Sequence, residues 1–225
     1  MRRAAAVAAV ALVAAGCGAE SRERSATFTT EIDNPYLPMV PGTRRVFRET
    51  DGDGAAQKVV VTVTSRTKRV ASGVVARVVR DTVTERGQVV EDTFDWYAQD
   101  DRGNVWYVGE DTTEYEDGRP VTKEGSWEAG VDGAKAGIVM PARPRVGMQY
   151  RQEHYAGHAE DMARVLSLDE QAEVPAGHFT GVLLTREWNP IEPEVLEYKL
   201  YAKGIGPVLA VSVSGGSDRE ELLPQ

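Results

Sequence analysis

The sequence predicts an all-β fold, in which an antiparallel sheet curves into a half-barrel or a barrel, with little helix beyond the N-terminal segment. Three observations point to this class. Runs of β-branched residues recur along the chain, apolar and polar residues alternate over several segments, and turn-forming residues separate these segments at fairly regular spacing. Short strands arranged in this way are typical of antiparallel sheets, sandwiches and barrels.

The clearest strand signals lie in the first half of the chain. Residues 59–64 and 74–84 are rich in valine and threonine, which favour extended backbone. A third segment, residues 90–99, comes close to the alternation of a half-buried strand. The turn-forming residues 100–104 follow it, and a short apolar run, 105–108, follows that turn. The sequence therefore predicts a β-hairpin over residues 89–109.

Further strands are expected near residues 112–116, 121–128, 148–156, 160–168, 179–188, 195–202 and 206–213. Turn residues separate several of them, for example Asp117-Gly118 and Pro175-Ala176-Gly177. One segment, 157–166, is ambiguous, because its apolar residues fit a helical stripe as well as a strand.

The N-terminus has the parts of an export signal. Two arginines precede an uncharged run of alanine, valine and leucine over residues 4–15, and small residues then lead to Cys17. The run is shorter than the roughly 20 apolar residues that a membrane-spanning helix needs. Small residues followed by cysteine resemble the bacterial lipobox, although Ala14 stands where leucine is usual.

We therefore expect a lipoprotein signal peptide at residues 1–16, lipid attachment at Cys17, a polar tether at 17–30 and one antiparallel β domain at 31–225. Acyl chains such as palmitate would anchor the exported protein to the membrane, at the outer face of the cytoplasmic membrane or in the cell envelope. The alternative is an ordinary secretory signal with an incidental cysteine.

Composition excludes several classes of protein. The chain has 35 acidic and 26 basic residues and a net charge of −9, so nucleic acid is not expected as a partner. Cys17 is the only cysteine, which leaves no thiol for disulfides, catalysis or metal binding once it carries a lipid. The sequence has no Gly-x-Ser-x-Gly elbow and no phosphate-binding glycine loop, so we predict neither an enzyme nor a cofactor.

Four aromatic residues of the predicted hairpin are candidates for ligand contact: Trp96, Tyr97, Trp106 and Tyr107. They lie among many acidic residues. Aromatic side chains on a curved sheet can stack on a sugar or line an apolar cavity. The alternative is that one face of each strand fills the core while the carboxylates are solvated.

Two histidines are candidate metal ligands. His154 and His158 would lie one turn apart on a helix and on the same face of a strand. Neither arrangement matches the metalloprotease motif, in which glutamate follows the first histidine directly. The alternative is a pair of polar residues near a turn.

Three stretches, DWYAQD at 95–100, GNVWY at 103–107 and YAKGIGPV at 201–208, resemble a family of uncharacterised secreted proteins and lipoproteins from bacteria, notably actinobacteria. The last stretch also resembles the ending of TapB-like domains. The resemblance implies a curved antiparallel sheet of the LolA-like or calycin-like kind. It implies no catalytic residue and no particular ligand.

The sequence thus predicts a membrane-anchored lipoprotein that binds an apolar or lipid-like small molecule or acts in the cell envelope. A surface domain that binds a protein or glycan is one alternative. A metal-binding lipoprotein that uses His154 and His158 is another. No protein partner can be named from the sequence.

Overall fold

The computed structural model describes residues 26–50 and 54–224, and every regular element within them is a β-strand. The predicted all-β class is therefore confirmed. The strands, in chain order, are β1 (Phe28–Thr29), β2 (Arg44–Thr50), β3 (Ala56–Arg69), β4 (Val75–Glu85), β5 (Gln88–Asp100), β6 (Val105–Glu116), β7 (Arg119–Thr122), β8 (Trp127–Glu128), β9 (Lys135–Met140), β10 (Gln149–Arg151), β11 (Glu153–His154), β12 (Met162–Val174), β13 (Gly177–Asn189), β14 (Glu192–Ala202), β15 (Gly206–Ser214) and β16 (Arg219–Leu222).

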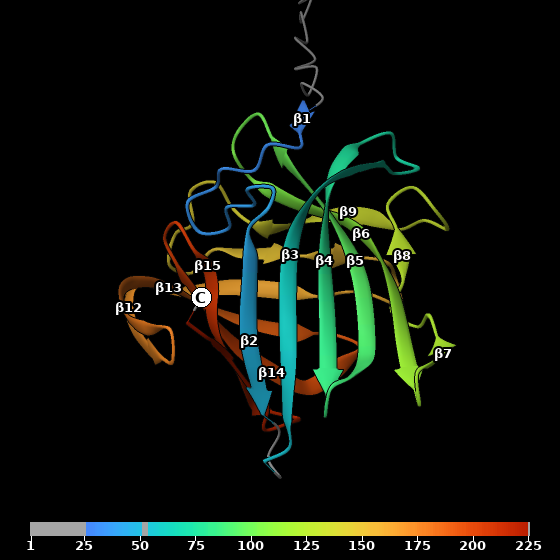
Figure 1. The fold of residues 1–225 in the computed structure, drawn as a ribbon. Helices are drawn as coiled ribbons and strands as arrows, with labels where there is room; N and C mark the ends of the chain where they lie inside the picture. The colour runs from blue at the N-terminus through green and yellow to red at the C-terminus, as the bar shows by residue number, and fades with distance from the viewer. Residues whose placement is uncertain (1–25, 51–53, 225) are drawn as a thin grey trace, which may run out of the picture.

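The strands form one antiparallel sheet that curls round on itself (Figure 1). Its order runs from β10 through β12, β13, β14, β15 and β16 to β2, and then through β3, β4, β5 and β6 to β9 and β11. Residues 149–154 join the two edges, because β10 pairs with β12 and β11 pairs with β9. The sheet is therefore a nearly closed barrel, as the sequence predicts.

Closure of the barrel requires a close approach at Gly137 of β9. A Cβ atom at this position would lie 2.2 Å from the carbonyl oxygen of Gln152, which belongs to the closing segment. Glycine has no Cβ, so the two stretches of backbone can pack together here. Any larger residue at position 137 would push the closing segment away from β9.

The hairpin predicted over residues 89–109 is present as β5 and β6. Asp100 shapes its turn, because its carboxylate accepts hydrogen bonds from the backbone N–H groups of Arg102 and Asn104. Both strands of the hairpin are longer than the sequence suggests, since β5 begins at Gln88 and β6 continues to Glu116.

The ambiguous segment 157–166 contains no helix, so its helical interpretation is wrong. Gly157 lies in a turn with a positive φ of 75°. In β12, which follows, buried Ala163 and Val165 alternate with exposed Arg164. The part of the segment from Met162 onward forms a strand with a period of two because it pairs with β13.

The folded domain begins earlier than predicted. β1 lies inside the segment 17–30 that we expected to be a tether, yet it pairs with the end of β5. The predicted signal peptide, residues 1–16, and the predicted lipid attachment site, Cys17, lie outside the described residues.

A strap over residues 32–41, rich in proline, covers one end of the barrel. The side-chain amide of Asn34 fastens it by donating hydrogen bonds to the carbonyl oxygens of Gly103 and Pro141. Apolar side chains of the strap join a core inside this end of the barrel, made of Ile32, Tyr36, Leu37, Met39, Val63, Val79, Val105, Met140, Leu183 and Tyr201.

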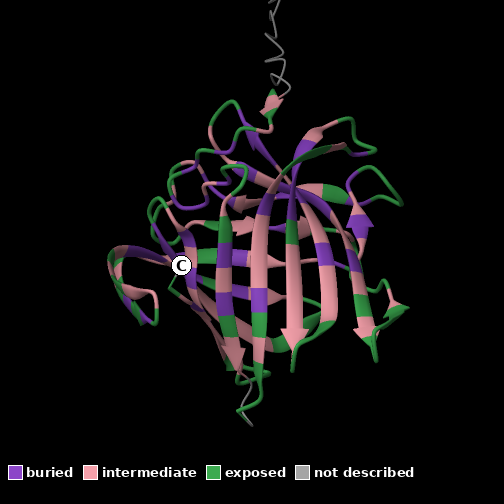
Figure 2. Ribbon diagram, in the orientation of Figure 1, coloured by how far each residue is buried: buried purple, intermediate pink, exposed green. Residues whose placement is uncertain are grey.

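The two ends of the barrel differ in burial. Buried residues gather toward the end that the strap covers, whereas β4 and β5 are mostly intermediate or exposed at their other ends (Figure 2). Inside the barrel, the space between these ends is lined by alternate residues of each strand, such as Val79 and Asp81 of β4. Among the described residues there is no helix with the length and apolar character needed to cross a membrane.

Candidate functional site

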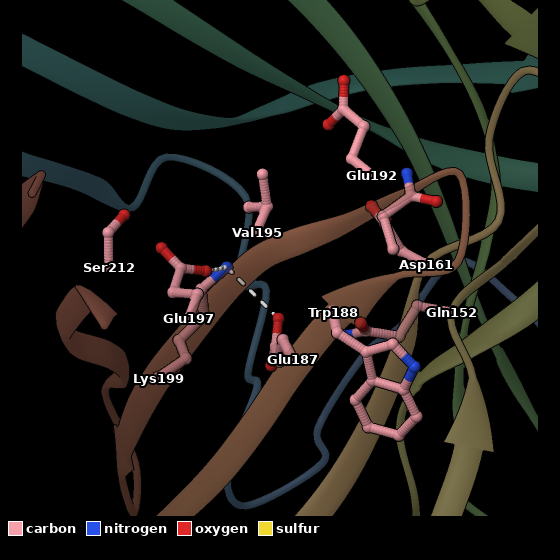
Figure 3. A pocket seen from close by; sticks show the side chains of 10 residues that line it. Gln152, Asp161, Glu187, Trp188, Glu192, Val195, Glu197, Lys199 and Ser212 are labelled. Atoms are coloured by element: carbon pink, nitrogen blue, oxygen red, sulfur yellow. Dashed lines mark ion pairs between the residues drawn. The ribbon is translucent and has the colours of Figure 1, made fainter. Parts of the chain in front are cut away.

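The interior of the barrel, called the lumen below, contains two hollows that meet at Lys199 of β14. The strap hollow has a volume of about 220 Å³ and lies beneath Leu37 and Met39. The lysine hollow has a volume of about 300 Å³ and extends toward the β13–β14 turn, where Asn189 and exposed Glu192 line it (Figure 3). Lys199 contributes to the walls of both hollows.

Lys199 forms two ion pairs inside the lumen. Its ammonium nitrogen lies 3.0 Å from a carboxylate oxygen of Glu197 and 3.4 Å from one of Glu187 (Figure 3). Burial alone would lower the pKa of Lys199, but the two carboxylates outweigh burial and raise it well above its usual value. Lys199 is therefore a fixed positive charge at neutral pH.

Glu187 is held in place by three neighbours. Its Oε1 atom accepts a hydrogen bond of 2.7 Å from the hydroxyl of Thr185 and one of 3.0 Å from the hydroxyl of Tyr201. Its other oxygen faces Lys199. A carboxylate with this many donors is held in one position, which makes it a rigid part of the wall.

Acidic residues stand directly opposite each other on neighbouring strands at four places on the lumen face of the sheet, where Glu114 is exposed at the open end. The pairs are Glu49 with Glu220, Glu91 with Glu114, Asp95 with Glu110, and Glu187 with Glu197. Like charges at directly opposed positions destabilise a sheet. Lys199 forms ion pairs with both members of the Glu187–Glu197 pair. Within the described residues, no lysine bridges any of the other three pairs in this way.

Several of these carboxyl groups have raised pKa values. Burial raises the pKa of Glu220 to about 7, against the opposing effect of Lys199. Burial raises the pKa of Glu110 to about 7 and that of Asp81 to about 6, and the charge of Glu91 adds to both shifts. These three carboxyl groups therefore have pKa values closer to neutral pH than ordinary carboxyl groups have.

One carboxylate oxygen in the strap hollow has no partner. The Oδ1 atom of Asp81 is buried and accepts no hydrogen bond from any of the residues in 26–50 and 54–224. An unpaired buried acceptor costs about 1–3 kcal/mol. A hydrogen-bond donor placed in the hollow would recover part of that free energy.

Two of the four predicted aromatic residues lie together in the lumen. Tyr97 and Tyr107 are directly paired across β5 and β6, and their rings stack with centroids 4.8 Å apart and an angle of 22°. The hydroxyl of Tyr107 donates a hydrogen bond of 2.6 Å to Asp95. Burial raises the pKa of Asp95 well above its usual value, although this hydrogen bond opposes the shift.

The other two aromatic residues face away from the lumen. Trp96 is only 6% exposed, and the ammonium of Lys68 lies 3.8 Å from the centre of its ring. Trp106 donates a hydrogen bond from its indole nitrogen to Asp100, and its ring meets the edge of Phe28. Strand alternation explains the division, because neighbouring residues on a strand point to opposite faces.

The two candidate histidines lie outside the lumen. His154 is exposed at the end of β11, and the ring of His158 stacks on Tyr155 with centroids 4.3 Å apart. Within the described part of the chain, no three histidine, aspartate or glutamate side chains gather in a way that would hold a metal ion. Metal binding by the two histidines stays a prediction.

The acidic lining of the lumen and its single lysine were not anticipated from the sequence. A signal was present in β5, because the alternation that places Tyr97 on one face places Glu91, Thr93 and Asp95 on the same face. In a chain with 35 acidic residues this pattern does not stand out. Lys199 and Glu220 come together because each lies opposite Ala210 of β15, a register that the sequence does not reveal.

Neither a protein-family model nor a curated protein matches the chain. Among solved structures, the chain is similar to a protein from Parabacteroides distasonis described as a "putative lipoprotein", with a TM-score of 0.46 and 13% sequence identity. The similarity covers 85% of this chain and 98% of that chain. A likeness this distant carries no weight for function, so the proposals below rest on the residues of the protein itself.

Proposed function

We propose that the protein is an exported lipoprotein whose barrel binds a small amphipathic cation, such as a short alkyl amine, in its lumen. The observation that carries the proposal is the set of four acidic pairs that face each other across neighbouring strands on the lumen face of the sheet. Three of these pairs have no lysine between them in the described residues. A bound cation would relieve their repulsion.

The positively charged group of the ligand has a defined place in the strap hollow. Asp81 presents its unpaired oxygen there, and Glu220 lines the same hollow. An ammonium group between these two side chains would donate a hydrogen bond to Asp81 and would favour the ionised form of both carboxyls. Arg45 and Lys199 also line the hollow, which limits it to one cationic group.

The rest of the ligand would be apolar and short. The apolar part of the strap hollow's lining consists of Leu37, Met39, Phe47, Val61, Val63, Val79 and Pro207. Hollows of about 220 and 300 Å³ lie at the lower end of the range of roughly 300–1,000 Å³ for ligand pockets. The size therefore favours a ligand with few heavy atoms. Because the lining is acidic, we propose an amine in place of the purely apolar ligand that the sequence suggests.

The proposed anchor is separate from the proposed binding site. Support for export and lipidation comes from the basic start, the apolar run 4–15 and the small residues before Cys17. The lipid would keep the barrel at a membrane surface, where it would take up its ligand from outside the cell membrane.

Thermal unfolding in the presence of three six-carbon probes tests the proposed ligand class. Hexylamine, hexanol and hexanoate have the same apolar chain and differ in the charge of the head group. At ten times its dissociation constant, a ligand stabilises the folded state by about 1.4 kcal/mol, which is a rise in Tm of about 2–5 °C for a chain of this size. We expect hexylamine to raise the Tm more than hexanol, and hexanoate to have no effect.

Variants distinguish lumen binding from a general effect of amines. The double variant Asp81→Asn/Glu220→Gln removes the proposed partners of the ammonium group and should abolish the hexylamine effect. The matched control, Asp169→Asn/Glu173→Gln, changes the same charges at two exposed positions and should preserve it. Equal stabilisation by hexanoate and hexylamine, or an unchanged effect in the lumen variant, would contradict the proposal.

A further inference from the structure

A third hollow lies outside the lumen, at the end of the barrel that the strap covers. Its volume is about 830 Å³, and it lies between the β5–β6 turn and the loop 141–148 that follows β9. Asn104 holds these two segments together, because its side-chain oxygen accepts a hydrogen bond of 2.8 Å from the backbone N–H of Ala142. The hollow is called the arginine groove below.

Three arginines line this groove: Arg102, Arg143 and Arg145. All three are exposed, and within residues 26–50 and 54–224 none of them lies within ion-pair distance of a carboxylate. One acidic residue, Asp101, also lines the groove. The groove therefore has a local excess of positive charge in a chain whose net charge is −9.

The arginine groove also has an apolar component. Ile138, Pro141 and Met148 contribute to its lining. In the loop beside them, the side chain of Val146 projects into solvent and is 65% exposed. Guanidinium groups next to apolar side chains suit a ligand that carries an acidic head group on an apolar body.

The groove lies at the end of the barrel where the chain enters from the N-terminus. Phe28 of β1 pairs with Asp100, two residues before Arg102. Covalent geometry limits the segment 18–27 to a length of about 35 Å, so a lipid on Cys17 would keep this end of the barrel near the membrane surface. The opposite end of the barrel, more than the length of a strand away, would face away from it.

We propose that the arginine groove binds the acidic head group of a membrane phospholipid, and so fixes which end of the barrel faces the membrane. The inference uses the lipid anchor of the proposed function and is independent of the ligand in the lumen. Charge complementarity supports it, since anionic lipid surfaces attract arginine and repel a protein of net negative charge. The exposed side chain of Val146 would enter the boundary between head groups and acyl chains.

The test uses the processed protein, reconstituted through its lipid into vesicles of phosphatidylcholine alone or of phosphatidylcholine mixed equally with phosphatidylglycerol. Hydrogen–deuterium exchange is measured over residues 100–104 and 141–148. Each arginine near an anionic surface contributes a factor of roughly five to binding. We therefore expect backbone exchange in both segments to be roughly fivefold slower, or more, in the anionic vesicles.

Two matched triple variants provide the control. Arg102→Gln/Arg143→Gln/Arg145→Gln should lose the difference between the two kinds of vesicle. Arg86→Gln/Arg119→Gln/Arg186→Gln removes the same charge from exposed positions elsewhere and should keep it. Equal exchange in both vesicles, or equal loss in both triple variants, would overturn the proposal.

Two further measurements are needed. One distinguishes a lipid head group from a free anion, and the other distinguishes a wrong anchor from a wrong groove. Inorganic phosphate added to phosphatidylcholine vesicles should leave exchange unchanged; slowing equal to that in anionic vesicles would mean a site for free anions and would also overturn the proposal. If the wild type carries no lipid, the anchor is wrong. Cosedimentation of the soluble protein with vesicles then tests the groove. The protein must bind anionic vesicles more strongly than neutral ones, and this preference must depend on the three groove arginines.

Discussion

The ammonium nitrogen of Lys199 lies 3.4 Å from the carboxylate of Glu187, inside a barrel whose lining combines apolar and acidic residues. Thr185 and Tyr201 hold Glu187 in position, and Glu197 provides the second carboxylate for Lys199. Glu187 is buried, so its carboxylate cannot be left without a counter-charge at low cost. We therefore expect Lys199 to stabilise the folded barrel by offsetting the repulsion between Glu187 and Glu197.

Replacing Lys199 by methionine should destabilise the fold strongly. The variant leaves Glu187 and Glu197 facing each other without a counter-charge, and removing one partner of a buried pair typically costs about 3–5 kcal/mol. Urea unfolding at pH 7 measures the loss. Lys58→Met, which removes an exposed lysine from β3, is the matched control and should change the free energy of unfolding by less than about 1 kcal/mol. Similar losses in the two variants would contradict the role of Lys199.

The same account predicts that Glu220→Gln stabilises the protein above pH 7. Burial raises the pKa of Glu220 from 4.5 to about 7 in the folded state. Between these two values the unfolded chain releases its proton while the folded protein retains it, so stability falls as the pH rises. Glutamine does not ionise and should remove this loss, giving a gain of about 1–3 kcal/mol at pH 8 and little change at pH 4.

Glu221, the next residue, provides a control, because its pKa is shifted in the direction opposite to that of Glu220. Burial alone would raise its pKa, but Arg48 and Arg219 outweigh burial and lower it. Its ionised form therefore stabilises the folded state above its unfolded pKa, and this contribution is lost as the pH falls. Glu221→Gln should lower the free energy of unfolding at pH 7 by up to about 1 kcal/mol. Urea unfolding from pH 4 to pH 8 measures both variants, and shifts of the same sign would contradict the assignment.

The tyrosine pair allows a test of the Asp95 hydrogen bond. Tyr107→Phe removes the only side-chain donor that the described residues give to Asp95, and should destabilise the protein by about 1–3 kcal/mol. Tyr97→Phe keeps the stacked ring and removes a hydroxyl that makes no hydrogen bond within the described residues. It should change stability by less than about 0.5 kcal/mol. Chemical unfolding at pH 7 compares the two, and an equal effect would mean that the hydrogen bond is unimportant.

The anchor has a direct cellular test. Cys17→Ser removes the thioether attachment point, so the protein should move from the membrane fraction to the soluble or secreted fraction. The wild type should carry the mass of an acylated N-terminus at Cys17. A wild type whose N-terminus is unmodified, or a Cys17→Ser protein that remains with the membrane, would contradict lipidation.

The fold followed from sequence wherever a strand showed its period of two in one continuous stretch. The hairpin of β5 and β6 is the best example, because a strong turn separates two aromatic strands. The strand β9 was missed, since its six residues include Gly137 and lack a clear alternation. The helical interpretation of 157–166 failed because Ala163 and Val165 fit both periods over so short a length.

The site followed from sequence only in part. Tyr97 and Tyr107 were expected to contact a ligand, and they do lie together in the lumen, whereas Trp96 and Trp106 occupy the outer face. The acidic pairs depend on the register between strands that are distant in sequence, as with Glu49 and Glu220. No local pattern encodes such a pairing.

The most direct test of the amine site is a solution NMR measurement of contacts between hexylamine and the side chains of the protein. The account predicts intermolecular nuclear Overhauser effects from the alkyl chain of the probe to the methyl groups of Val61, Val63 and Val79, which line the strap hollow. These effects should disappear in Asp81→Asn/Glu220→Gln and should be absent with hexanoate. Contacts only to exposed methyl groups such as those of Val121, or none with hexylamine present at saturation, would contradict a cation-binding lumen.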